Sequence, residues 1–258
     1  MPRPENFSTR PILDKVTRLL YQPEINENSQ KRIQEIKDFL KNNHEYIFII
    51  YFNHISLNDP AVVLHLAEQI SPEGHNQHLL APVSYSHADT SKLEGKIFQS
   101  FNHLINKASI ETVPIIQNYQ IDDEKYRYTQ NQADATYFKY LRRLKELKKS
   151  NIQIGVLISP EGHRSEDGQL SEGEKGVIAT GKILAPVVYV PAGIHYINIK
   201  DAKELGNYKR NSFNPGRKMA INVGEITQQE HYKDEPSLEE LMKKLALALP
   251  EKMRGVWQ

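Results

Sequence analysis

Short apolar runs alternate with longer amphipathic stretches along this chain, and this alternation constrains its fold more than any other feature. Residues 46–52 are apolar at every position and rich in β-branched side chains, which is typical of a strand covered on both faces. Strands that alternate with helices favour a parallel sheet. We therefore predict an α/β fold, a single domain with a mostly parallel central sheet flanked by helices. Further strands are predicted at residues 78–85, 112–116, 153–159, 185–191 and 218–226.

Helices are predicted around these strands, wherever apolar side chains recur at helical spacing. Ser237 and Glu240 form a capping box that opens the last helix. A polar loop is predicted at residues 118–136 and a basic helix at 137–149. The other predicted helices are at residues 29–42, 60–70, 93–105 and 175–184. The predicted organisation is an N-terminal helical segment at 1–44 packed on the core, a main domain at 45–226, and a linker with a C-terminal helix at 227–258.

Residues 9–21 predict a further, amphipathic helix, and two roles remain open for it. We expect its apolar stripe to pack on the core, while the alternative is a helix that lies on a membrane surface. The stripe consists of Ile12, Leu13, Val16, Leu19 and Leu20, with Asp14, Lys15 and Arg18 between them.

Composition narrows the classes of function. The formal net charge of +1 gives no indication of nucleic-acid binding. The absence of cysteine excludes disulfides, thiolate catalysis and cysteine-based zinc sites. Residues 1–10 lack the apolar segment of a secretory signal, and no apolar run approaches the roughly 18 residues of a spanning helix. We expect a cytoplasmic protein whose contact with membranes, if any, is peripheral.

A histidine and an aspartate follow the first predicted strand. His54 lies in the loop after it, and Asp59-Pro60 is a helix-start signal. A neutral imidazole accepts a proton near physiological pH, and a carboxylate on its other nitrogen stabilises the cation that forms. The pair therefore fits a general base. The alternative is that Asp59 only caps the helix and His54 is a polar loop residue.

A second polar cluster follows the strand at 153–159. Arg164 offers the forked guanidinium that binds phosphate or carboxylate, and Glu161 can accept a hydrogen bond. Gly162 allows a close approach of ligand or backbone. Ligands in open α/β sheets collect at the carboxyl ends of strands, so the two clusters predict one site. A surface turn held by an ion pair is the alternative.

Other kinds of site are not supported by the sequence. There is no Gly-x-Ser-x-Gly nucleophile elbow, and Ser56 is only a weak candidate nucleophile. No metal-binding motif and no glycine-rich phosphate loop are present. A general base without a protein nucleophile indicates that the substrate supplies the nucleophile, as when a hydroxyl attacks an activated carbonyl.

These stretches together resemble the glycerolipid acyltransferase family, which includes the 1-acylglycerol-3-phosphate acyltransferases. Residues 53–60 match its Asn-His-x-x-x-x-Asp block, and residues 160–165 resemble its Phe-Pro-Glu-Gly-Thr-Arg-Ser block. Lys175-Gly176 and the proline-containing run at 185–191 follow in the family's order. The resemblance covers roughly residues 45–226.

The resemblance implies a glycerol-3-phosphate acyltransferase-like fold and transfer of a fatty acyl group to a hydroxyl of a glycerolipid precursor, such as 1-acylglycerol 3-phosphate. Acyl-CoA or acyl carrier protein is the implied donor and partner, with no metal or prosthetic group. His54 is implied as the general base and Asp59 as its orienting partner. The implied substrate-binding residues are Asn53, Glu161, Gly162, Arg164, Ser165 and Pro186.

The chain departs from the family pattern at the position that is expected to bind the acceptor's phosphate. Gln117 stands where an arginine is expected, so the acceptor differs or another cation, such as Arg127 or one on the 137–149 helix, replaces it. That helix and the loop with Lys200, Lys203, Lys209, Arg210, Arg217 and Lys218 fit an anionic membrane or an acidic carrier protein. Solvated charged surfaces are the alternative. A lipid-binding protein without catalysis and an acyl-thioester hydrolase remain alternative functions.

Overall fold

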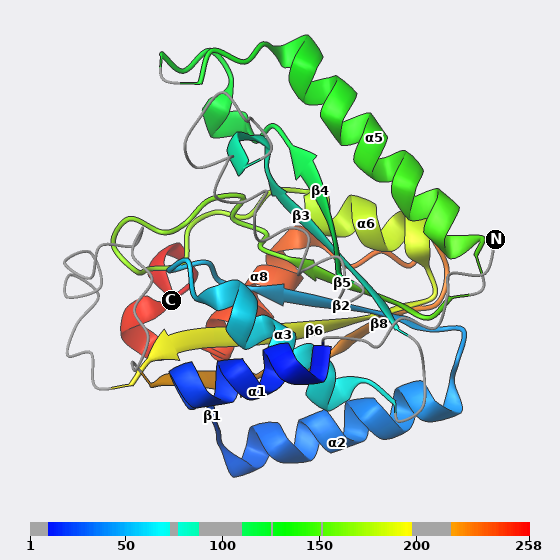
Figure 1. Cartoon of the computed structure of the whole chain (residues 1–258), viewed down its shortest axis with the longest axis vertical. Coiled ribbons are helices and arrows are strands. Elements are labelled where there is room, and N and C mark those ends of the chain that lie inside the picture. The colour runs from blue at the N-terminus through cyan, green and yellow to red at the C-terminus, as the bar shows by residue number, and fades with distance from the viewer. Residues whose placement is uncertain (1–9, 73–76, 88–109, 125, 151, 198–217) are drawn as a thin grey trace. The chain divides into compact units, whose positions relative to one another are not determined.

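The computed structural model describes residues 10–72, 77–87, 110–124, 126–150, 152–197 and 218–258 (Figure 1). The chain separates into two compact units: the smaller unit comprises residues 1–13 and 76–154, and the larger unit comprises residues 14–75 and 155–258. The predicted helix at 93–105 and the predicted cations at 200, 203, 209, 210 and 217 lie outside the described residues. The predicted boundaries at residues 45 and 226 stay predictions.

A mostly parallel sheet forms the centre of the larger unit, which confirms the predicted α/β class. Its middle strand β2 (Ile47–Phe52) is buried along its whole length and lies parallel to β5 (Ile154–Ile158) and β6 (Val187–Tyr196). Beyond β6 the sheet is mixed, because β7 (Met219–Val223) and β8 (Thr227–Gln229) pair antiparallel with β6. The two-residue β1 (Glu24–Ile25) and β8 were not predicted.

Helices cover both faces of this sheet (Figure 1). On one face lie α2 (Glu27–Asn42), whose N-cap Asn26 accepts from the backbone of Ser29, and α3 (Asp59–Ile70). On the other face lie α6 (Gly176–Leu184) and α8 (Leu238–Leu247), and Ser237 caps α8 as predicted. Two short 3₁₀ helices, Glu251–Met253 and Gly255–Trp257, follow α8. None of the helices in the described residues combines the length and apolar character needed to cross a bilayer.

In the N-terminal helix α1 (Arg10–Tyr21), the residues from Asp14 to Tyr21 pack in the opposite sense to our expectation. The side chains of Ile12 and Leu13, which also belong to the predicted stripe, are not among those that the structure describes. Asp14, Thr17 and Tyr21 are buried, whereas Val16 and Leu19 are exposed. The reason is a set of polar partners on α3: Asp14 Oδ1 lies 2.5 Å from His65 Nδ1, and the Tyr21 hydroxyl donates to Asn58 Oδ1 at 3.0 Å. The polar side of α1 therefore contacts the protein.

The smaller unit holds two parallel strands, β3 (His78–Ser84) and β4 (Ile110–Ile115), with α5 (Gln130–Lys148) packed on β4. The loop predicted at 118–136 is wrong for its last seven residues. Thr129 and Gln132 form a capping box that starts α5 there, and the predicted basic helix is its second half. Two short 3₁₀ helices, Tyr85–His87 and Asn118–Gln120, complete the unit's described elements.

Candidate functional site

The loop between β2 and α3 brings a histidine and a buried carboxylate into direct contact. β2 ends at Phe52 and α3 begins at Asp59, with Pro60 in its first turn. Asp59 is completely buried, and its Oδ2 lies 2.8 Å from Nδ1 of His54. The side chain of His54 keeps 24% of its surface exposed. A base with a buried orienting carboxylate thus faces the outside of the larger unit.

The hydrogen bonds around Asp59 define which nitrogen of His54 carries the proton. Oδ2 also accepts from the backbone N–H groups of Ile55 (2.6 Å) and Ser56 (2.8 Å), and Oδ1 accepts from the Ser56 hydroxyl (2.6 Å). An aspartate carboxylate can only accept hydrogen bonds. Nδ1 must then donate, so a neutral His54 presents the lone pair of Nε2. Within the described residues, Nε2 has no hydrogen-bond partner.

The second polar segment forms hydrogen bonds with the backbone of His54. The N–H of His54 donates to Glu161 Oε2 at 2.9 Å, and its carbonyl accepts from the N–H of Ser165 at 2.7 Å. The two segments are 107 residues apart in sequence. The two predicted clusters therefore lie side by side, after the neighbouring parallel strands β2 and β5.

Glu161 is almost fully buried and its oxygens are occupied by protein donors. Beside the His54 N–H, it accepts from the backbone N–H and the hydroxyl of Ser171, at 2.9 and 3.1 Å. Burial raises the pKa of Glu161 to about 7, although these hydrogen bonds act in the opposite direction. Ser171 was not among the predicted site residues, and its carbonyl accepts in turn from the indole N–H of Trp257. No local pattern marks a serine ten residues away as a partner of Glu161.

The turn after Glu161 depends on a glycine. Gly162 has φ +70°, in the left-handed region that favours glycine, and its N–H donates to the carbonyl of Ser159. This turn lets Glu161 point inward while the chain returns to Ser165 beside His54. Arg164 directly precedes Ser165 in this loop and is half-buried.

Three further residues considered in the sequence have defined positions. Asn53 is buried and bonds both backbone groups of Ile194, at 2.7 and 2.9 Å, so it joins the end of β2 to β6. Ser56 is buried with its hydroxyl committed to Asp59. Pro186 does not join the others, because it precedes β6 and pairs beside Ile47 at the start of β2. The seven residue steps from Ile47 to His54 put Pro186 on the order of 20 Å from the histidine.

The candidate phosphate-binding positions lie in the smaller unit. The N–H of Gln117 donates to the side chain of Gln120 in a short helical turn. Arg143 on α5 is engaged with Glu111 and Glu146, while Arg142 is largely exposed beside Glu146. Whether these cations serve the His54 site stays a prediction.

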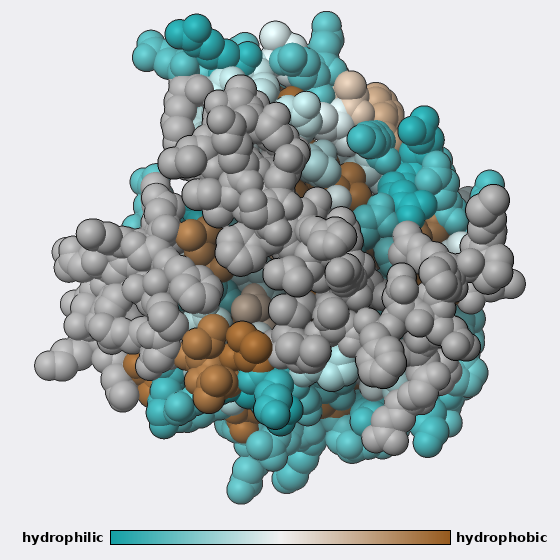
Figure 2. Space-filling view, in the orientation of Figure 1, coloured by the Kyte–Doolittle hydropathy of each residue, from teal (hydrophilic) through white to brown (hydrophobic). Residues whose placement is uncertain are grey.

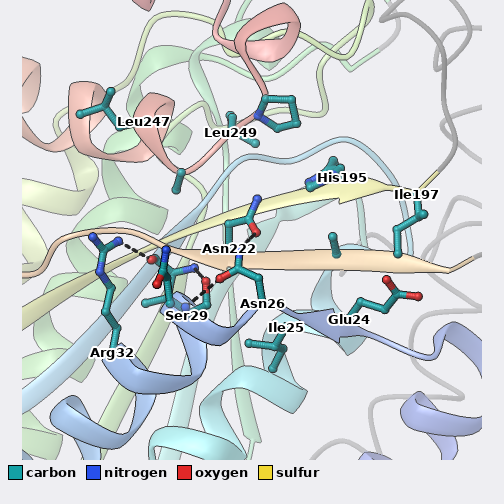
Figure 3. Close-up of a pocket in the computed structure, with 15 residues that line it drawn as sticks. Glu24, Ile25, Asn26, Ser29, Arg32, His195, Ile197, Asn222, Leu247 and Leu249 are labelled. Atoms are coloured by element: carbon teal, nitrogen blue, oxygen red, sulfur yellow. Dashed lines mark hydrogen bonds between the residues drawn. The ribbon is translucent and has the colours of Figure 1, made fainter.

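A separate pocket of about 660 Å3 occurs in the larger unit (Figure 3). It is lined by the start of α2, by β6 and β7, and by the end of α8; His54 and Asp59 are not among its lining residues. Several of its polar groups are already paired, since Asn26 donates to Asn222 and Arg32 donates to the carbonyl of Val223. His195 points into it from β6, and burial lowers the pKa of this imidazole. Among the described residues Nδ1 of His195 has no hydrogen-bond partner, so the carboxylate pairing seen at His54 is absent there.

The described residues contain no cluster of three or more histidines, aspartates and glutamates that could hold a metal ion. A scan against models of known protein families finds no match for this chain, and a search of curated proteins finds no significant relative.

Proposed function

We propose that this protein transfers a fatty acyl group from a thioester, on coenzyme A or acyl carrier protein, to a hydroxyl of a glycerolipid precursor such as 1-acylglycerol 3-phosphate. The observation that carries the proposal is the contact between His54 Nδ1 and the buried Asp59, which leaves Nε2 as the accepting nitrogen. The family resemblance of the two segments supplies the substrate class. The glycerol-3-phosphate acyltransferase-like version of the α/β fold is part of the same proposal.

In the proposed reaction His54 acts as a general base. Nε2 takes the proton of the acceptor hydroxyl as its oxygen attacks the thioester carbonyl. The C–S bond breaks as the tetrahedral intermediate collapses, and the proton on Nε2 passes to the leaving thiolate. Asp59 stays ionised throughout and stabilises the imidazolium. Because the Ser56 hydroxyl is committed to Asp59, the attacking oxygen is assigned to the substrate.

The second segment contributes position and charge. Arg164 is proposed to bind the anionic part of the acceptor, as the resemblance implies. Glu161 is proposed to act differently from that implication, as a positioning residue, because its oxygens hold His54 and Ser171. Asn53 likewise supports the loop through Ile194.

An acceptor-dependence assay tests the proposal against its alternatives. Purified protein is given acyl-CoA or acyl carrier protein thioesters with and without a panel of hydroxyl acceptors, including 1-acylglycerol 3-phosphate, and free thiol and acylated product are measured. We expect thiol release that requires an acceptor and equals product formed. Thiol release at the same rate with and without an acceptor would instead identify a hydrolase. Binding of thioester or lipid without turnover would identify a lipid-binding protein.

A further inference from the structure

Two apolar side chains of helix α1, Val16 and Leu19, point to the outside and form its exposed stripe. Leu19 is 76% exposed and Val16 is 43% exposed, while Leu20 is partly buried. Figure 2 shows hydrophobic surface where Figure 1 draws this helix. A surface helix of a globular protein normally turns its apolar stripe to the core, so a stripe left in water indicates an interaction surface.

Polar contacts hold α1 in this orientation. Asp14 bonds His65 in the middle of α3, and Tyr21 donates to Asn58 at the start of α3. Asn58 in turn donates to the hydroxyl of Tyr196 on β6 at 2.7 Å. Rotating the stripe inward would break these buried hydrogen bonds, each costly to leave unmade. The exposed stripe is therefore built into the fold.

The charges beside the stripe identify its partner. Asp14 is the helix's single acidic residue, and it is buried. The exposed side chains next to Val16 and Leu19 include Lys15 and Arg18, although Arg18 also contacts Asp14 at 3.2 Å. An apolar stripe flanked by cations matches an anionic bilayer surface. A second copy of the chain fits less well, because a two-fold contact would bring the same cations together.

We propose that α1 binds the surface of an anionic lipid bilayer, with Val16 and Leu19 in the acyl boundary and Lys15 and Arg18 at the headgroups. Tyr21 bonds Asn58, the residue before Asp59, so the helix is tied directly to the loop that carries His54. Docking through α1 thus holds that loop close to the lipid surface. This binding does not require the reaction proposed above.

Vesicle co-sedimentation of the full chain tests this surface. The vesicles are phosphatidylcholine alone or phosphatidylcholine with phosphatidylglycerol, and binding is measured with a salt series. The wild type is expected to bind the anionic vesicles, less at high salt. Leu19→Asp is expected to weaken binding at least about tenfold, and Lys15→Glu several-fold, about 1 kcal/mol being available per surface cation.

The matched control is Leu247→Asp, which changes another leucine of the larger unit that is 70% exposed on a helix, α8. It is expected to bind vesicles like the wild type. Thermal unfolding of each variant confirms that it folds. Failure of the wild type to bind anionic vesicles, equal losses in Leu19→Asp and Leu247→Asp, or a dimer that Leu19→Asp dissociates without vesicle binding would each overturn the proposal. Vesicle binding without acyl transfer would uphold it and count against the proposed reaction alone.

Discussion

The backbone N–H of His54 donates to the buried carboxylate of Glu161 at 2.9 Å. This bond, with the return bond from Ser165 to the His54 carbonyl, fixes the histidine from the segment that carries Arg164. The base is thus oriented twice, at its ring by Asp59 and at its backbone by Glu161. Its position depends on residues more than a hundred apart in sequence.

Titration of Glu161 should affect stability. Its pKa of about 7 in the folded protein lies above its ordinary value of 4.5, because burial disfavours the charge. Between these values the native state holds a proton that the unfolded chain has lost. The free energy of unfolding therefore falls as the pH rises through this window, by up to about 3 kcal/mol.

Glu161→Gln removes this titration. The variant should gain stability relative to the wild type as the pH rises from about 5 to about 8, and urea unfolding at both pH values measures the difference. The substitution also places an amide nitrogen where an oxygen now accepts, so we expect slower acyl transfer through a displaced His54. A stability difference that stays constant with pH would contradict the buried, titrating carboxyl.

Asp59→Asn should separate the role of Asp59 in orienting His54 from the effect of its negative charge. The amide oxygen can still accept from the donors at Oδ2, but a neutral group stabilises the imidazolium poorly. We expect the variant to fold with a loss of about 1–3 kcal/mol and to lose activity about 100-fold or more. Ser56→Ala is the control, since it removes a single bond to Asp59. Equal rates for Asp59→Asn and the wild type would rule out this role.

Two glycines of α6 should respond oppositely to alanine. A Cβ at Gly181 would lie 1.7 Å from the hydroxyl oxygen of Tyr189, which is buried and donates to Gln229. Gly181→Ala should therefore cost about 2 kcal/mol or more, despite the better helix propensity of alanine. At Gly176 a Cβ meets nothing within 4 Å, so Gly176→Ala should be neutral or slightly stabilising. Similar melting temperatures for the two variants would show that α6 does not pack this closely on β6.

An ion pair in the smaller unit should stabilise it at neutral pH. Arg143 contacts both oxygens of Glu111, at 2.7 and 2.8 Å, and His78 lies 2.9 Å from Oε2. Burial acts to raise the pKa of Glu111, but these hydrogen bonds hold it at about 2. The ordinary pKa of a glutamate is 4.5, so the ionised Glu111 stabilises the folded protein at pH values above about 4.5. This stabilisation is lost as the pH falls from about 4.5 towards 2.

Arg143→Met and Arg142→Met form a matched pair for this contact. Arg142 is 75% exposed and 3.7 Å from Glu146, so its loss should cost well under about 1 kcal/mol. Arg143→Met should cost about 1–3 kcal/mol at neutral pH and less in acid. Chemical unfolding of both variants measures the difference, and equal costs would show that the Glu111 pair is merely a surface contact.

Much of the fold could be predicted because local patterns agree with the tertiary structure. The apolar run at 46–52 became β2, and Asp59-Pro60 started α3 where expected. The antiparallel pairing of β7 with β6 could not be predicted, since the direction of a strand depends on the connection and not on local composition. The start of α5 was missed although Thr129 and Gln132 carry a capping-box pattern, because the tyrosines before it lack periodicity.

The polar residues of the site could be predicted from the sequence, but the separate role of each residue could not. His54 and Asp59 are near in sequence, so their contact follows from a short loop that leads directly into a helix. The burial of Glu161 against Ser171 depends on the path of a distant loop. Val16 and Leu19 of α1 are exposed, against the expectation for the apolar stripe, because the partner of Asp14, His65, comes close to it only in the folded chain.

The rate of acceptor-dependent thiol release by His54→Ala tests the proposed mechanism most directly. His163→Ala is the matched control, a second histidine in the adjoining segment that has no part in the proposed proton transfer. We predict a loss of about 100-fold or more for His54→Ala and a nearly unchanged rate for His163→Ala. Turnover by His54→Ala at the wild-type rate would contradict general base catalysis by this residue.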